Sequence, residues 1–120
     1  MVRFYQLIIF LCYFFTETDY AASHHPQTFL AQVHGSAHEG EQIVQHYCAL
    51  CHAATPQIPI GAPRMHVQED WAWRIKAGLQ QLFQHTSEGY QAMPARGGCL
   101  ECSDEQLLLA IKAMLPLSDK

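Results

Sequence analysis

Apolar residues recur with helical spacing in three stretches of the chain. In the first, residues 38–47, Ile43, Val44 and Tyr47 fall on one face at i, i+1 and i+4 spacing. No stretch alternates regularly between apolar and polar positions, as a half-buried strand would. The pattern therefore predicts an all-α domain.

The second predicted helix extends from Asp70 to His85. Asp70 belongs to the residue types that favour a helix N-cap, because its carboxylate can accept a hydrogen bond from an N–H of the first turn. The apolar residues behind it would share one face, since they mostly lie three or four positions apart. They are Trp71, Ile75, Leu79, Leu82 and Phe83. We expect one continuous helix here.

The third predicted helix begins at Ser103. Gln106 stands three residues later, so the two side chains can form a capping box with each other's backbone N–H groups. The apolar face that follows consists of Leu107, Leu108, Ala110, Ile111 and Met114. Pro116 predicts the end of this helix, because proline cannot continue it.

Two long segments between these helices contain too much proline and glycine to be regular helices. Residues 55–68 read TPQIPIGAPRMHVQ, and residues 86–99 read TSEGYQAMPARGGC. A folded unit of roughly 80 residues with such loops buries only a modest core, and domains of this size usually need an additional stabilising element. A large apolar cofactor enclosed by the loops would supply it.

The N-terminal residues differ in composition from the rest. Residues 4–15, FYQLIIFLCYFF, form an apolar run of twelve residues, which is short for a membrane span of roughly 20. With its basic start and polar end, the segment 1–22 is predicted to be a secretory signal peptide, or alternatively an uncleaved anchor. Residues 23–37 lack a sustained period and predict a flexible leader. The folded domain is then expected over residues 38–120.

The formal net charge of the chain is −4 at pH 7. Without residues 1–22 the chain would keep six basic and nine acidic side chains, so six minus nine gives −3. This balance argues against a nucleic-acid partner. An exported chain would keep two cysteine pairs, Cys48/Cys51 and Cys99/Cys102, and an even count in an oxidising compartment implies that none is a free thiol.

The most informative motif lies in residues 46–55, HYCALCHAAT. The pair Cys48 and Cys51 alone fits three chemistries, namely thiol–disulfide exchange, zinc coordination together with the second cysteine pair, and covalent haem attachment. Thiol exchange favours cysteines at a helix N-terminus, whereas here the predicted helix precedes the pair. Zinc ribbons place their pairs roughly 15 to 20 residues apart, whereas 47 residues separate Cys51 from Cys99. Both remain as alternatives.

Haem attachment uses every residue of CALCH. Two sulfur atoms one turn apart can bond to the two vinyl groups of one porphyrin, and His52 directly behind them can reach the iron, which makes C-x-x-C-H the c-type haem signature. The sixth ligand decides the function. An open position would permit an enzyme or a ligand sensor, whereas a strong ligand restricts the iron to electron transfer. Met93 lies 41 residues downstream beside Pro94 in a glycine-rich loop, so we predict His52 and Met93 as axial ligands.

These motifs resemble those of the class I cytochromes c, and within them the small bacterial cytochromes c5. The resemblance covers about residues 40–114 and rests on CALCH, GAPR, DWAWRIKAG and AMPARGGCLECSDEQL. It implies a small all-α fold, with three to four short helices and long loops wrapped around one covalently bound haem c. It also implies a periplasmic electron carrier rather than an enzyme, with redox partner proteins such as membrane oxidoreductases or terminal oxidases.

The resemblance further implies roles for individual residues. Met93 corresponds to the distal ligand, Cys99 and Cys102 correspond to a disulfide, and the carbonyl of Pro63 corresponds to the group that accepts a hydrogen bond from the imidazole of His52. Fixing that imidazole would be the task of a residue outside the ligand set.

Two residues are candidates for supporting the haem. Arg64 can pair with a haem propionate, because a guanidinium binds a carboxylate through two hydrogen bonds. Trp71 is expected in the core against the haem. One position departs from the class I pattern, since Val44 occupies the place where an aromatic residue is common, with Tyr47 as a candidate to supply the ring. Gly40 fits the position of close helix approach.

Overall fold

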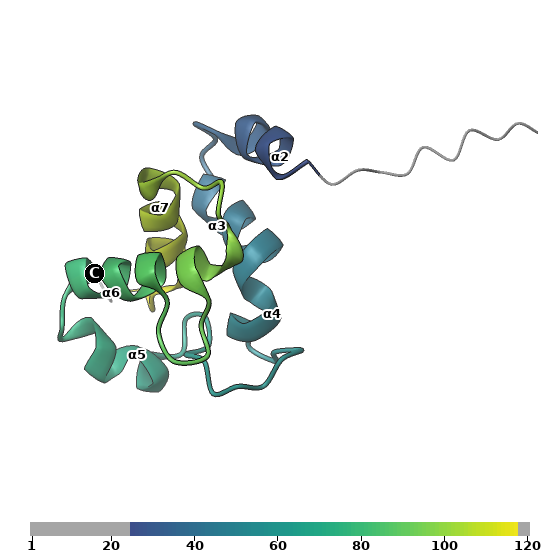
Figure 1. Ribbon diagram of the computed structural model, residues 1–120. Coiled ribbons are helices and arrows are strands. Elements are labelled where there is room, and N and C mark those ends of the chain that lie inside the picture. Colours follow the sequence, from purple (N-terminus) through teal and green to yellow (C-terminus); the bar gives the residue numbers. More distant parts are fainter. Residues whose placement is uncertain (1–24, 118–120) are drawn as a thin grey trace, which may run out of the picture.

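The computed structural model describes residues 25–117, and within them the chain is helical with no strand (Figure 1). The elements are α2 (Pro26–Val33), α3 (Glu39–Ile43), the π-helix η2 (Val44–Cys48), α4 (Ala49–His52), α5 (Gln68–Ile75), α6 (Leu79–Glu88), the 3₁₀ helix η3 (Ala95–Gly98) and α7 (Asp104–Met114). The predicted all-α class is confirmed. The predicted signal peptide, residues 1–22, lies outside the described residues.

The centre of the fold is the crossing of α3 with α7, which lie side by side in Figure 1. Gly40 permits the close approach, because a Cβ atom at this position would lie only 2.5 Å from the backbone oxygen of Leu109. Ile43, Val44 and Ile111 are almost completely buried around this contact. Val44 is therefore part of the core, at the position where an aromatic residue is common.

Helix α7 begins as predicted. The Ser103 hydroxyl accepts a hydrogen bond from the Gln106 N–H, and the Gln106 side chain accepts one from the Ser103 N–H, so the capping box is formed. The helix ends at Met114, two residues before Pro116. Its buried face packs on the rest of the core and consists of Gln106, Leu107, Ala110, Ile111 and Met114.

The prediction of one helix from Asp70 to His85 is wrong, because this stretch forms two helices, α5 and α6. Gly78 separates them with a φ of +88°, a backbone conformation that glycine adopts easily and residues with a Cβ do not. The N-cap of α5 is Val67 rather than Asp70, which lies inside the first turn. The apolar period continues across the break, so the pattern alone did not reveal it.

The prediction of a flexible leader over residues 23–37 is also wrong in part, because α2 lies within it. Pro26 begins this helix, where a missing N–H is harmless. Leu30 and Val33 are buried in the hydrophobic core, and the ring of Phe29 stacks on a side chain of η2. Eight residues are too few for a stable isolated helix, so α2 depends on this packing.

A buried carboxylate fastens the turn between α2 and α3 to α7. Glu39 is 5 % exposed, and its carboxylate accepts hydrogen bonds from the Gly35 N–H (2.7 Å) and from the Gln106 side-chain amide (2.9 Å). The Nδ1 atom of His34 lies 3.3 Å from Oε1 of Glu39. Burial raises the pKa of Glu39, but the hydrogen bonds from Gln106, Gly35 and His34 outweigh it and hold the pKa below its ordinary value.

Glu39→Gln is expected to lower the free energy of unfolding by about 1 to 3 kcal/mol at pH 7, because an amide cannot accept all of these hydrogen bonds. A carboxyl whose pKa is lowered by folding stabilises the protein above its unfolded pKa of about 4.3, and this contribution is lost as the pH falls through the folded pKa. The difference between wild type and variant should therefore shrink towards acid pH. Urea unfolding at a series of pH values measures it.

The matched control is Glu41→Gln on the same helix, where the carboxylate is 59 % exposed and its imidazole partner lies 4.0 Å away. We expect the control to change the free energy of unfolding by less than about 0.5 kcal/mol. A difference between wild type and Glu39→Gln that grew on acidification would contradict the assigned role of the Glu39 carboxylate.

Candidate functional site

One cavity of about 260 Å³ brings together the four residues on which the haem hypothesis depends. Cys48, Cys51 and His52 line it from η2 and α4, and Met93 lines it from the loop that precedes η3. Most of the other lining residues are apolar, among them Ile58, Ile60, Trp71, Leu82, Ile111 and Met114. Residues far apart in the sequence thus surround a single apolar space.

The two cysteines of the motif lie one helical turn apart and are not joined to each other. Both Cys48 and Cys51 are half-buried free thiols at the wall of the cavity. Burial and the neighbouring Cys51 raise the pKa of Cys48 to about 11. A thiol with so little thiolate at neutral pH is a poor nucleophile, which argues against thiol–disulfide exchange.

The imidazole of His52 is held in a defined orientation. The side chain is 6 % exposed, and its Nδ1 lies 2.7 Å from the carbonyl oxygen of Pro63. Because a carbonyl only accepts hydrogen bonds, Nδ1 must carry the proton, and Nε2 keeps a free lone pair. The contact expected between His52 and Pro63 is therefore present, and it leaves Nε2 able to bind a metal.

The second cysteine pair is separate from this cavity. Cys99 and Cys102 form a disulfide, and both residues are buried. Within residues 25–117, no group of three or more His, Cys, Asp or Glu side chains could hold a metal ion. The alternative of a zinc module built from the two cysteine pairs is thus contradicted.

A tight loop positions Met93. Its N–H and carbonyl pair with the carbonyl and N–H of Tyr90, at 2.9 and 3.0 Å. The ring of Tyr90 stacks on His85 at a centroid distance of 4.1 Å, which ties the loop to α6. Met114 also lines the cavity, from the buried face of α7, whereas Met65 does not. The half-buried Met93 is the methionine that the loop itself carries into the cavity.

The donor atoms of the cavity fit a covalently attached haem. Two thiols one turn apart and a preoriented imidazole lie at the attachment segment, and a thioether enters from a different segment. Such a set of two thiols, imidazole and thioether in an apolar enclosure is the chemistry that a c-type haem requires.

Comparison with known proteins agrees with this chemistry. A family model described as "Cytochrome C oxidase, cbb3-type, subunit III" matches residues 35–112. Cytochrome c5 of Azotobacter vinelandii is 35 % identical over 82 residues, which are 67 % of this chain and 95 % of that protein. The chain belongs to the class I c-type cytochromes. Its similarity to the cytochromes c5 confirms the family resemblance seen in the motifs.

Two further relatives support the same assignment. Cytochrome c5 of Ectopseudomonas mendocina is 33 % identical to this cytochrome over 88 residues, 70 % of this chain and 95 % of that protein. Cytochrome c-555 of Chlorobaculum tepidum is 33 % identical over 72 residues, 57 % of this chain and 64 % of that protein. This cytochrome is accordingly an electron carrier rather than an enzyme, and its cofactor is covalently bound haem c.

No helix formed by residues 25–117 of this cytochrome has both the length and the apolar character needed to cross a membrane.

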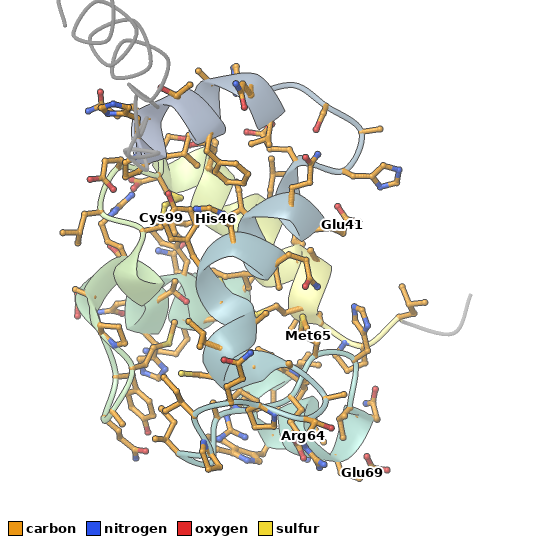
Figure 2. All side chains as sticks on the ribbon, turned by 90° about the vertical axis from the view of Figure 1, so that its right-hand side faces the viewer. Glu41, His46, Arg64, Met65, Glu69 and Cys99 are labelled. Carbon is orange, nitrogen blue, oxygen red and sulfur yellow. A yellow bond between two sulfur atoms is a disulfide. The ribbon has the colours of Figure 1, made fainter. Side chains whose placement is uncertain are left out.

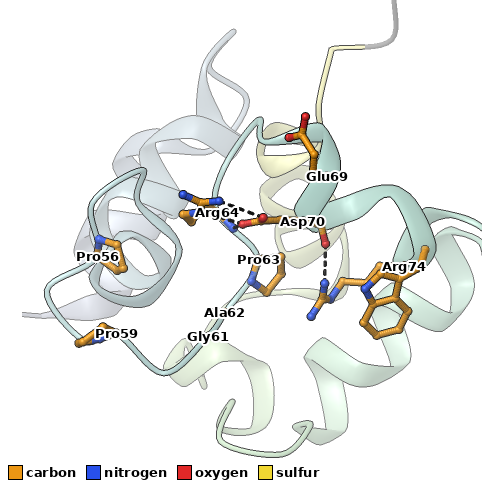
Figure 3. Close-up of a pocket in the computed structure, with 10 residues that line it drawn as sticks. Pro56, Pro59, Gly61, Ala62, Pro63, Arg64, Glu69, Asp70 and Arg74 are labelled. Atoms are coloured by element: carbon orange, nitrogen blue, oxygen red, sulfur yellow. Dashed lines mark hydrogen bonds and ion pairs between the residues drawn. The ribbon is translucent and has the colours of Figure 1, made fainter.

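Arg64 does not line the cavity of this cytochrome. Its Nε and a terminal nitrogen bind the two carboxylate oxygens of Asp70 at 2.8 and 3.1 Å, as Figure 3 shows. Among the arginines and lysines of the described residues, only Arg74 lines the cavity. The sequence did carry a signal for Arg74, because it follows Trp71 by three positions and so shares its helix face.

Trp71 is buried in the core, as the sequence predicted. It is 4 % exposed, lines the cavity, and donates a hydrogen bond from its indole Nε1 to the carbonyl of Arg64 at 2.8 Å. Trp73, by contrast, is 58 % exposed, and the guanidinium of Arg74 lies 4.2 Å above its ring. The two tryptophans of α5 thus have different surroundings, one in the core and one at the surface.

Proposed function

We propose that this cytochrome transfers single electrons between redox partner proteins in the periplasm, through a haem iron ligated by His52 and Met93. Partners of the expected kind are membrane oxidoreductases or terminal oxidases. The observation that carries the proposal is the meeting of His52 and Met93 in one apolar cavity with Cys48 and Cys51. An enzyme or ligand sensor would need an open sixth position, and a methionine in this cavity argues against one.

Each residue of the site has a task in this proposal. The sulfur atoms of Cys48 and Cys51 would form the thioether bonds, and His52 through Nε2 and Met93 through its sulfur would bind the iron. When bound, the haem supplies an iron centre that alternates between the ferric and ferrous states. The thioether of Met93 would favour the ferrous state, and the apolar lining would act in the same direction because it excludes water.

Two side chains of α5 are proposed to support the haem. Arg74, rather than Arg64, is the cation proposed to pair with a haem propionate. The Arg64 guanidinium is bound by the Asp70 carboxylate at the surface, whereas the Arg74 guanidinium, within the described residues, donates only to the Asp70 backbone carbonyl and Arg74 lines the cavity. Trp71 is buried and lines the cavity, so it would contact the haem from within the core.

Residues 1–22 are proposed to be a signal peptide that directs this cytochrome to the periplasm. If the segment is not cleaved, it would anchor the domain to the membrane instead. The mass of the protein isolated from cells distinguishes these outcomes, since cleavage removes the N-terminal residues and leaves the haem domain unchanged.

The visible spectrum of the purified holoprotein tests the proposed function. We expect haem c bands that respond to reductant, a weak thioether-to-iron band in the far red of the ferric form, and a one-electron potentiometric titration that is reversible. Absence of haem bands would overturn the proposal, and a ferrous form that bound carbon monoxide readily would favour an open site.

Replacing both cysteines, Cys48→Ser with Cys51→Ser, is expected to abolish covalent haem attachment, because serine hydroxyls do not form the thioether bonds. Each single variant should retain at most one bond. Mass spectrometry of the denatured protein measures the attached haem directly. The matched control is Cys99→Ser with Cys102→Ser, which removes two sulfurs outside the cavity and should leave the haem attached. Haem retained by the first double variant would disprove the assigned attachment sites.

A further inference from the structure

Two successive hydrogen bonds fix the loop that faces the buried side of His52. The carbonyl of Pro63 accepts a hydrogen bond from the imidazole Nδ1 at 2.7 Å. The N–H of Met65 donates a hydrogen bond to the backbone carbonyl of His52, also at 2.7 Å. Both neighbours of Arg64 therefore contact His52. Pro63 contacts the His52 side chain, and Met65 contacts the His52 backbone. A shift of the Arg64 backbone would therefore displace both groups that contact His52.

Helix α5 holds the backbone of Arg64 from the other side. The Arg64 N–H donates to Oδ2 of Asp70 at 2.9 Å, and the Arg64 carbonyl accepts from the indole of Trp71 at 2.8 Å. Asp70 also binds the guanidinium of the same residue (Figure 3). Three donors of one residue thus converge on a single carboxylate. The Pro63 carbonyl and the Arg64 N–H belong to the same peptide group. This one group therefore contacts His52 through its oxygen and Asp70 through its N–H.

The carboxylate of Asp70 is well suited to this task. Hydrogen bonds from the Arg64 side chain and backbone hold the pKa of Asp70 at about 2, so the group is ionised at neutral pH. Hydrogen bonds to an ionised acceptor are stronger than those between neutral groups. Asp70 does not act as the N-cap of α5, since Val67 occupies that position. Its side-chain contacts lead to Arg64 and from there to the segment that holds His52.

We propose that Asp70 is a positioning residue for His52, the proximal ligand. Asp70 fixes the Arg64 backbone and thereby keeps the Pro63 carbonyl hydrogen-bonded to Nδ1 of His52. This inference rests on the proposed function, in which His52 binds the iron. A hydrogen bond at Nδ1 makes the imidazole a more basic ligand, which favours the ferric state. Asp70 would therefore influence the reduction potential without touching the haem.

Asp70→Ala tests this role in the holoprotein. We expect the ferrous-to-ferric ratio at a fixed applied potential to rise about fivefold, the size of effect that one weakened hydrogen bond produces. Potentiometric titration measures this ratio. Amide hydrogen exchange of Met65 should also accelerate about fivefold, because its hydrogen bond to the His52 carbonyl depends on the same loop.

Asp70→Asn separates positioning from charge. The side-chain carbonyl of asparagine can still accept from the Arg64 N–H, so this variant should keep a ratio within about twofold of wild type although it removes the charge. Asp104→Ala is a further control, since it removes a carboxylate that binds Arg96 at 3.0 Å. Figure 2 places Cys99, near that pair in sequence, at the opposite end of the domain from Arg64.

Three outcomes would overturn the inference. Equal shifts in Asp70→Ala and Asp70→Asn would mean that charge alone acts, and an equal shift in Asp104→Ala would mean that the effect is not specific to this loop. An unchanged potential together with unchanged Met65 exchange in Asp70→Ala would leave Asp70 without a positioning role. Met65 exchange does not depend on which ligands bind the iron, so it tests the loop even if the proposed function fails.

Discussion

Met93→Ala is expected to abolish the far-red thioether-to-iron band completely and to open the iron of the ferrous protein to carbon monoxide. Alanine has no donor atom, and the loop that carries residue 93 is held by its own backbone pairing with Tyr90, so it should remain in place. Loss of the thioether should also lower the reduction potential, because this ligand favours the ferrous state. Visible spectra with and without carbon monoxide measure the loss of the band and the opening of the iron, and potentiometric titration measures the change in potential.

The other two methionines of the domain provide the controls. Met65 does not line the cavity, so Met65→Ala should retain the far-red band. Met114 lines the cavity but is 3 % exposed on the core face of α7, so Met114→Ala should lower stability and still retain the band. A band that survived in Met93→Ala and disappeared in Met114→Ala would assign the sixth ligand to Met114 instead.

Gly40→Ala is expected to lower the free energy of unfolding by about 3 kcal/mol, at the upper end of overpacking effects. The added Cβ would lie 2.5 Å from the oxygen and 2.8 Å from the carbon of the Leu109 carbonyl, and both are backbone atoms that cannot rotate away. Helices α3 and α7 would have to separate. Because α3 continues through η2 into α4, the separation would also disturb the segment that carries Cys48, Cys51 and His52.

Urea unfolding of wild type and variant measures this effect. In an open helix the same substitution would be stabilising by roughly 0.5 to 1 kcal/mol, because alanine has the higher helix propensity. The sign alone therefore reports on the helix crossing. Gln45→Ala, at an exposed position of the same helical run, should change the free energy by less than about 0.5 kcal/mol. A Gly40→Ala variant as stable as wild type would show that the two helices can move apart at little cost.

Local chemistry made several parts of this cytochrome predictable. The motif CALCH needs no tertiary information, because the two sulfurs and the imidazole of His52 are placed relative to one another by a single helical segment. The capping box of Ser103 and Gln106 is likewise formed by residues three positions apart, and it was predicted correctly. Met93 was a prediction from its place in a long loop, and the structure brings it to the same cavity as His52.

The predictions that were wrong concern elements whose formation depends on distant contacts. The apolar spacing of α5 and α6 continues through Gly78, whose positive φ breaks the helix without interrupting the pattern. Helix α2 has only eight residues, and it forms because Leu30 and Val33 are buried against a core that the local sequence does not contain.

Asp70 and the two arginines show most clearly what only the tertiary structure decided. By residue type, Asp70 is a good N-cap and Arg64 is a good partner for a propionate, but the folded chain places them together and each satisfies the other. Arg74 is left as the cation at the cavity. The sequence by itself determined which chemical groups this cytochrome possesses and how neighbours along one helix are spaced. Which charged group meets which partner depended on the folded path of the chain, because Arg64 lies in an irregular loop before α5 and no helical spacing relates it to Asp70.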